Sequence, residues 1–121
     1  MDPRDNSFIE FVRDQLRDLG NTTFRRMFGG YGIYAGETFF GILHAGRLYF
    51  KTNTASRVRY RDRGMEALRA TAKQTLTNYY EVPADVLEDS EVLTEWARQS
   101  IAVAGIRDTR TAPARSRAKK K

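Results

Sequence analysis

Four short runs rich in aromatic and branched residues lie between Thr23 and Thr52, and they limit the fold more than any other feature. The runs read TFRRMF, GIY, TFFGILH and RLYFKT, and the breaks between them contain glycine. Runs of this length and composition favour β-strands. Because the breaks are only a few residues long, neighbouring strands are expected to form antiparallel hairpins.

The run TFFGILH is expected to lie inside the sheet. Strict alternation divides its residues between two faces, with Phe39, Gly41 and Leu43 on one and Phe40, Ile42 and His44 on the other. Both sets are largely apolar, which predicts a central strand that is at least partly covered on both sides.

Two helices are predicted around these strands. Residues 7–19 carry an apolar stripe at helical spacing, with a capping box at Ser7 and Glu10 and a C-cap at Gly20. Residues 54–63 are expected to form the second helix, which ends at Gly64.

The second half of the chain predicts a hairpin and a last helix. Strands are expected at residues 67–71 and 75–82, joined across AKQ, and Pro83 ends the second because proline cannot donate to a strand ladder. After a helical turn at 84–89, the last helix is capped by Asp89 or Ser90 and ends at Gly105. Its predicted buried stripe is Leu93, Trp96, Ala97, Ile101 and Ala104.

The element order is therefore α-β(3)-α-β(2)-α, with three or four strands in the first group. Such an order predicts an α+β fold, in which helices flank an antiparallel sheet. Residues 1–106 are expected to form this domain. Residues 107–121 have no apolar periodicity and are predicted to be a disordered basic tail.

The net charge of +6 comes entirely from the predicted tail. Of the 21 basic and 15 acidic residues, seven basic and one acidic lie in residues 107–121, which leaves 14 of each sign in residues 1–106. Nucleic-acid binding by charge is therefore a hypothesis for the tail alone, through phosphate contacts that read no sequence. The candidate residues are Arg115, Arg117, Lys119, Lys120 and Lys121. A solubilising end is the alternative interpretation.

Composition excludes several kinds of chemistry. The chain has no cysteine, which excludes disulfides, thiol nucleophiles and thiolate metal sites. Its only histidine, His44, is expected to be half-exposed beside a turn, and no metal site or cofactor is predicted. No run approaches the ~20 apolar residues of a membrane span, and the N-terminus does not resemble a signal peptide. A cytoplasmic protein without membrane contact is expected.

The stretch RRMFGGYGIY carries three glycines behind two arginines, which raises the question of a nucleotide loop. A dinucleotide fingerprint needs a third glycine where Ala35 stands, and a helix after it, whereas a strand follows here. The glycines Gly29, Gly30 and Gly32 are therefore predicted to form a corner between strands, where positive φ angles or close backbone contacts exclude a Cβ. A small-molecule site at residues 29–34 is the alternative.

Arginines and tyrosines elsewhere do not converge on one site. Arg57 and Arg61 lie on one side of the predicted second helix and Arg59 and Arg63 on the other, so intramolecular partners are expected.

Strand alternation separates two further pairs of neighbours. Arg25 and Arg26 point to opposite sides of their strand, as do Tyr79 and Tyr80, so the two tyrosines cannot build one acid–base site with Glu81.

The motifs RRMFGGYGIY, LYFKT, YYEVPADVLED and WAR, in this order, resemble the N-terminal domain of the TfoX/Sxy proteins, which are regulators of natural competence. The resemblance covers about residues 7–105, and the chain is interpreted as a stand-alone domain without the family's helical C-terminal domain. It implies the same α+β fold, no known enzymatic activity and no cofactor. The signature residues are expected to be structural: Arg26, Met27, Phe28, Gly29, Gly30, Gly32, Tyr49, Phe50, Lys51, Tyr60, Gly64, Met65, Tyr79, Tyr80, Glu81, Pro83 and Trp96.

The resulting functional hypothesis is a non-enzymatic regulatory or adaptor domain. Its expected partner is a protein such as a transcription factor, and a homodimer through a sheet edge or an aromatic strand is a further hypothesis. The alternatives are a nucleic-acid-associated protein that binds through its basic tail and a small-molecule-binding domain.

Overall fold

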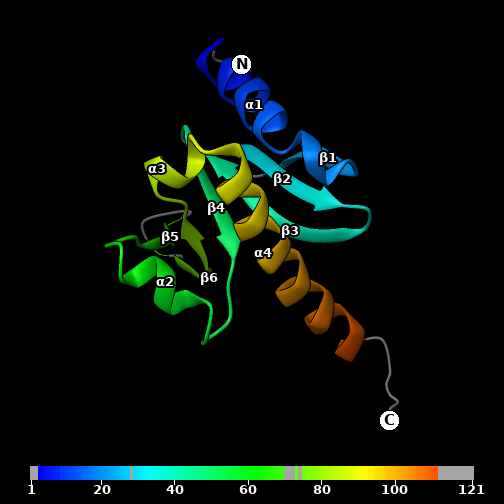
Figure 1. The fold of residues 1–121 in the computed structure, drawn as a ribbon, viewed down its shortest axis with the longest axis vertical. Helices are drawn as coiled ribbons and strands as arrows, with labels where there is room; N and C mark the ends of the chain where they lie inside the picture. The colour runs from blue at the N-terminus through cyan, green and yellow to red at the C-terminus, as the bar shows by residue number, and fades with distance from the viewer. Residues whose placement is uncertain (1–2, 28, 70–72, 74, 112–121) are drawn as a thin grey trace.

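Six strands form one antiparallel sheet in a computed structural model of the chain, which describes residues 3–27, 29–69, 73 and 75–111. The strand order is β1-β2-β3-β4-β6-β5, and helices flank the sheet (Figure 1). The predicted α+β class is confirmed, and the first group of strands has four members. The turn AKQ lies largely outside the described residues.

The elements follow the predicted order. The strands are β1 (Thr22–Met27), β2 (Gly30–Ala35), β3 (Thr38–His44), β4 (Arg47–Lys51), β5 (Ala67–Arg69) and β6 (Thr75–Glu81). The helices are α1 (Pro3–Gln15), the 3-10 turn η1 (Arg17–Leu19), α2 (Arg57–Arg61), α3 (Ala84–Leu87) and α4 (Ser90–Thr111).

The predicted start of the first helix is wrong, whereas the predicted cap at Gly20 is confirmed. α1 begins at Pro3, so Ser7 lies inside the helix and the predicted capping box is wrong. Proline suits the first turn of a helix, because the amide it lacks would have no partner there. Gly20 ends η1 with φ 79°, which confirms its predicted role as a cap.

The later helices also depart from their predicted lengths. α2 is shorter than expected because a turn precedes it. In this turn the side chains of Asn53 and Ser56 each accept a hydrogen bond from the other residue's backbone amide.

α4 begins as predicted, with the Asp89 carboxylate accepting from the amides of Glu91 and Val92. It then passes through Gly105 to Thr111, so the predicted end is wrong and residues 107–111 are helical. A glycine costs only about 1 kcal/mol inside a helix, too little to end one already packed on a sheet.

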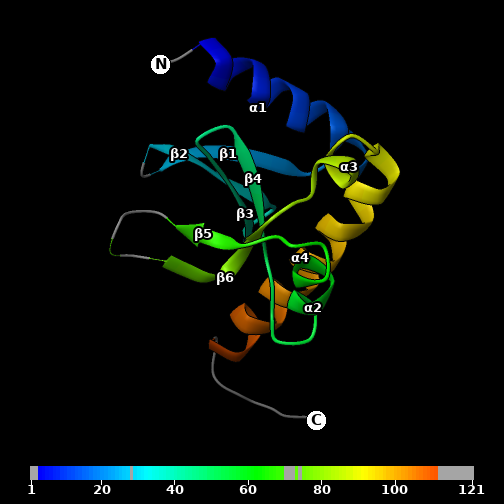
Figure 2. The ribbon, with the colours of Figure 1, turned by 90° about the vertical axis from the view of Figure 1, so that its left-hand side faces the viewer.

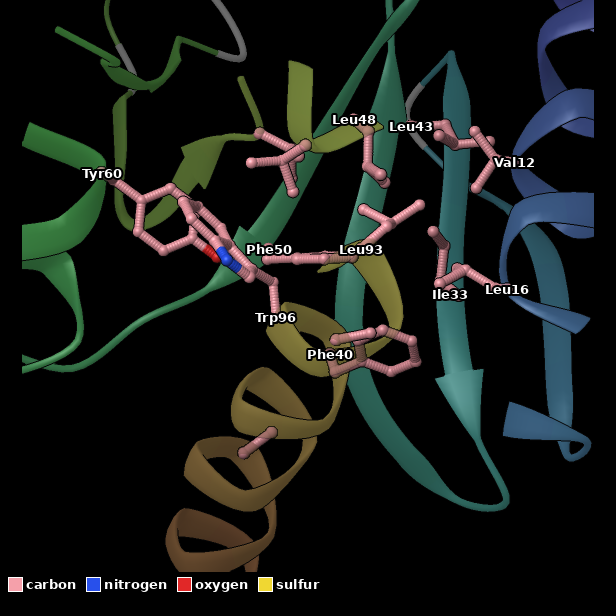
Figure 3. Close-up of a cluster of buried hydrophobic side chains, with 14 of the residues drawn as sticks. Val12, Leu16, Ile33, Phe40, Leu43, Leu48, Phe50, Tyr60, Leu93 and Trp96 are labelled. Carbon is pink, nitrogen blue, oxygen red and sulfur yellow. The ribbon is translucent and has the colours of Figure 1, made fainter. Parts of the chain in front are cut away.

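All four α-helices contribute to one hydrophobic cluster on a single face of the sheet. In Figure 2, α1 lies above the strands, and α2, α3 and the first turns of α4 lie to their right. Figure 3 shows Val12 of α1 and Leu16, which follows this helix, on one side of the cluster, with Tyr60 of α2 and Trp96 of α4 on the other. The Tyr60 and Trp96 rings meet edge-on with centroids 4.8 Å apart. Burial raises the pKa of Tyr60 above its ordinary value.

A β-bulge in β3 changes which residues share a face. Ile33 pairs with Gly41 but the next residue of β2, Tyr34, pairs with Phe39, so Phe40 is skipped. Phe40 therefore packs in the helix-covered cluster, as Leu43 does, whereas Ile42 packs in a second cluster on the opposite side. The predicted strict alternation is wrong at this point because the bulge moves the strand out of phase by one residue. The predicted central position of the strand, with apolar cover on both sides, is confirmed.

The bulge leaves a backbone carbonyl that α4 satisfies. Phe40 has no register partner in β2 or in β4. The hydroxyl of Ser100, which is fully buried, donates its proton toward the carbonyl oxygens of Phe40 and Lys51, at 2.9 and 3.0 Å from Oγ. Because buried carbonyls need partners, this serine fixes α4 on the irregular part of the sheet.

Thr94 of α4 gives a stability prediction. Its Oγ1 is buried, and no hydrogen-bond partner for it is found among the residues that the structure describes. Replacing Thr94 by valine keeps the shape and removes an unsatisfied polar atom, so we expect about 1 kcal/mol of added stability and a Tm about 4 °C higher by calorimetry. Thr94→Ser, which keeps the hydroxyl and loses the methyl group, is expected to be less stable than the starting protein.

Candidate interaction face of the sheet

The face of the sheet opposite the helices carries a hydrophobic cluster built from strand residues only. Its buried members are Ile42, Tyr49, Leu68 and Tyr79, and Phe39 and Leu76 pack against them. They come from β3, β4, β5 and β6, and we call this side of the sheet the helix-free face. None of the helices that the structure describes covers this face, and its apolar character makes it the first candidate for an interaction surface.

Three rings form a continuous row across this face. Tyr34 and Phe39 are register partners in β2 and β3 and stack with centroids 5.1 Å apart. Phe39 then meets Tyr79 of β6 at 5.7 Å, although β4 lies between β3 and β6 in the strand order. This contact across a non-adjacent strand shows that the sheet curls on its helix-free side. We call Tyr34, Phe39 and Tyr79 the aromatic row.

A cation lies over each end of the aromatic row. The guanidinium carbon of Arg25, an exposed residue of β1, lies 4.6 Å from the Tyr34 ring centroid. At the other end, Nζ of Lys51 lies 5.0 Å from the Tyr79 ring centroid, with the side chain buried. Such contacts stabilise by about 0.5–1 kcal/mol at exposed sites and more when desolvated.

An ion pair lies beside the row. The Arg47 guanidinium donates to both carboxylate oxygens of Glu81, at 3.1 and 3.0 Å. This carboxylate raises the pKa of Arg47, chiefly through the hydrogen bond. The pKa of Tyr49, which pairs with Glu81 across the strands, is raised by burial and by the same carboxylate. The Glu81 carboxylate and the Arg47 guanidinium thus form a bidentate pair beside the row.

The glycine stretch forms the predicted corner between β1 and β2. Gly29 has φ 76°, and a Cβ on Gly30 would overlap the carbonyl oxygen of Leu43, so both predicted reasons for glycine are found. A cavity of about 20 Å³ lies there, between the corner, α1 and the turn after His44. A water molecule needs about 10–15 Å³ by this measure, so the space suits a water molecule rather than a nucleotide. His44 is half-buried beside that turn, as predicted.

Three of the four arginines of and just beyond α2 have the intramolecular partners expected from the sequence. Arg57 donates to the Asn78 side-chain oxygen at 2.9 Å. Arg59 and Arg63 both lie over the Trp96 ring, at 4.4 and 5.7 Å from its centroid, which confirms that they share one side. Arg63 also pairs with Asp85 at 2.6 Å, and the hydrogen bond lowers the pKa of that carboxyl.

The family-signature residues divide between the two faces of the sheet. Six lie on the helix-free face, in the aromatic row or next to it: Met27, Gly32, Tyr49, Lys51, Tyr79 and Glu81. Phe50, Tyr60, Met65, Tyr80 and Trp96 pack in the helix-covered cluster, and Arg26 lies 5.8 Å over Tyr31. Tyr79 and Tyr80 therefore do face opposite sides. Gly64 has φ 77° after α2, and Pro83 precedes α3.

Several predicted residues cannot be placed. Phe28 lies outside the described residues, and so do the candidate nucleic-acid contacts Arg115, Arg117, Lys119, Lys120 and Lys121. The nucleic-acid hypothesis therefore stays a prediction from the sequence.

The match to a known family covers the elements just described. The model of the TfoX N-terminal domain family matches residues 14–104 of the 121-residue chain. The chain belongs to the TfoX N-terminal domain family. The matched segment includes all six strands, and hence both the glycine corner and the aromatic row. Comparison of this TfoX N-terminal domain with curated proteins gives no significant match.

The described part of this TfoX N-terminal domain has neither a candidate metal site nor a helix suited to span a membrane. In that part, no group of three or more histidine and acidic side chains could hold a metal ion. Among its helices, none combines the length and the apolarity that crossing a bilayer requires.

Sequence reasoning missed Arg25, Tyr34 and Phe39 as members of one site. A signal for the first ring pair was present in the short break AGET between two predicted strands. A hairpin loop this short makes the residues that flank it, Tyr34 and Phe39, cross-strand partners. The contact between Phe39 and Tyr79 had no such signal, since it depends on how the sheet curls.

Proposed function

We propose that this TfoX N-terminal domain is a non-enzymatic regulatory adaptor that acts through protein–protein contacts in transcription regulation. The helix-free face is its contact surface in this proposal. The observation that carries it is the aromatic row, a set of aromatic rings on a sheet face without helical cover. Aromatic residues with arginine beside them are enriched where proteins bind each other.

The charges around the row support binding rather than catalysis. Arg47 and Glu81 neutralise each other, and Arg25 and Lys51 lie over rings. Because each of these charged groups lies against a ring or an opposite charge, it is placed to orient a bound partner on this face.

A genetic experiment tests this proposal. The gene is deleted from its host, and transcripts are measured by RNA sequencing before and after complementation. We expect a defined set of transcripts to change on deletion and to be restored by the unaltered gene. Complementation with Tyr34→Ser/Phe39→Ser is expected to restore less than half of that change, because the variant loses two rings of the row.

The matched control is Val58→Ser, which also exchanges an apolar side chain for a hydroxyl but lies on α2, where Val58 is 51% exposed. It should complement fully. Circular dichroism of each purified variant verifies that it is folded. A deletion that leaves the transcripts unchanged would contradict the regulatory proposal, and full complementation by the row variant would remove the helix-free face from it.

The charge of residues 107–121 favours a second candidate, nucleic-acid binding through the tail. Seven basic residues against one acid would attract phosphate backbones without reading sequence. Truncation after Ile106 is expected to abolish binding of duplex DNA measured by fluorescence anisotropy, and binding by the full chain should fall steeply between 50 and 200 mM salt. Duplex binding that survives the truncation would refute the tail as the site.

A further inference from the structure

β1 forms a long open edge of the sheet. It spans the six residues Thr22–Met27, stands at one end of the strand order and, among the strands that the structure describes, pairs with β2 alone. The edge strand at the other end, β5, has three residues. An edge strand presents unpaired N–H and C=O groups to which another extended chain can add.

Two adjacent arginines make the chemistry of this edge specific. Arg25 lies over Tyr34 on the helix-free face, and Arg26 lies over Tyr31 on the other face. Both are exposed, and neither has a carboxylate partner among the described residues. A guanidinium that lies over a ring keeps its N–H donors, which are in its own plane, available for a further acceptor.

We infer that the β1 edge binds an extended acidic segment of a protein partner, which adds to the sheet as a seventh strand. Successive side chains of such a strand point to opposite faces, as Arg25 and Arg26 do. Two consecutive acidic residues of the partner would therefore reach the two arginines, one on each face. The inference rests on the proposed function, because it names the class of partner that the adaptor binds.

The same arginines disfavour a second copy of this chain as the occupant. Two-fold antiparallel pairing of β1 with itself keeps each side chain on its own face. In the registers that pair most of the strand, the two Arg25 side chains then lie opposite or diagonal to each other, roughly 5–8 Å apart. Like charges at that separation destabilise the pair, whereas an acidic strand gains from both arginines.

Fluorescence anisotropy with a labelled peptide tests the inference. The probe has eight residues, threonine and valine in alternation around a central pair of glutamates, and the protein is the full chain. We expect saturable binding that weakens with salt. The same peptide with methylated amide nitrogens at alternate positions should bind at least tenfold more weakly, because it cannot complete the strand ladder.

Charge reversal provides the matched variants. Arg25→Glu/Arg26→Glu is expected to lose about tenfold in affinity for the glutamate peptide and to gain affinity for the version with two lysines, since the sign of both contacts reverses. Arg61→Glu/Arg98→Glu is the control, because both arginines are exposed, on α2 and α4, and the change of charge is the same. Because these side chains are exposed, the variants should fold, and circular dichroism checks this.

Several outcomes would overturn the inference. These are the absence of binding by the glutamate peptide, equal binding of the methylated peptide, and an equal loss in Arg61→Glu/Arg98→Glu. A single-stranded oligonucleotide that displaces the peptide with higher affinity would assign the arginines to phosphate binding instead. The peptide assay is independent of the transcript experiment. Binding without transcript effects would leave this inference standing and remove the regulatory function.

Discussion

Replacing Gly30 by alanine is expected to destabilise the domain by at least about 3 kcal/mol, a large part of the roughly 5–15 kcal/mol that holds a typical domain folded. The new Cβ would overlap the carbonyl oxygen of Leu43 and lie 3.1 Å from its carbonyl carbon. Both atoms belong to the backbone of β3, so no side-chain rotation can relieve the contact. The end of β2 would have to separate from β3, with loss of the pairing between Tyr31 and Leu43.

Gly29→Ala is the matched control. Its Cβ would meet nothing within 4 Å, and only the positive φ of 76° opposes it. The expected loss is about 1 kcal/mol, the ordinary cost of that backbone conformation for a residue with a Cβ. Urea unfolding at equilibrium measures both variants. Equal losses of stability in the two variants would show that the close approach of β3 is not the reason for a glycine at position 30.

Ser100→Ala is expected to cost about 2 kcal/mol. The change leaves the buried carbonyl oxygens of Phe40 and Lys51 without their hydroxyl donor, and an unsatisfied buried group costs about 1–3 kcal/mol. Alanine is the better helix former by roughly 0.5 kcal/mol, which offsets part of the loss. Denaturant unfolding gives the net value, and amide hydrogen exchange in β3 and the end of β4 should become faster.

Arg98→Ala serves as the control for the serine variant, because this exposed residue lies in the same helix and receives the same replacement. It should change stability by less than about 0.5 kcal/mol. Ser100→Cys, with a weaker donor, is expected to fall between serine and alanine. If Ser100→Ala unfolds at the same urea concentration as the starting protein, the hydroxyl does not hold α4 on the bulge.

Much of the fold follows from local patterns in the sequence. Glycine-containing breaks and aromatic runs predicted the first four strands, and β5 and β6 were predicted as a second hairpin across AKQ, because short loops allow few alternatives to hairpins. The pairing of β4 with β6 was beyond such reasoning, since these strands are separated by a helix and another strand. α4 was predicted from its stripe, but Gly105 misled the prediction of its end because packing outweighs the propensity of a single residue.

The candidate site was less predictable than the fold. Separation of Tyr79 from Tyr80 followed from strand alternation and is confirmed. The aromatic row depends on the curl of the sheet, which no local pattern encodes. Ser100 was missed because its role arises only when a bulge frees the carbonyl of Phe40, and a bulge cannot be recognised where both faces of a strand are apolar.

The bulge at Phe40 also determines how β3 should be compared with related sequences. The strand consists of two segments in opposite phase, Thr38–Phe39 and Gly41–His44, joined at one unpaired residue. An alignment gap placed on the wrong side of Phe40 would exchange inward-facing and outward-facing positions along a whole segment. Substitutions in relatives can therefore be assigned to the core or to the helix-free face only after Phe40 itself has been matched.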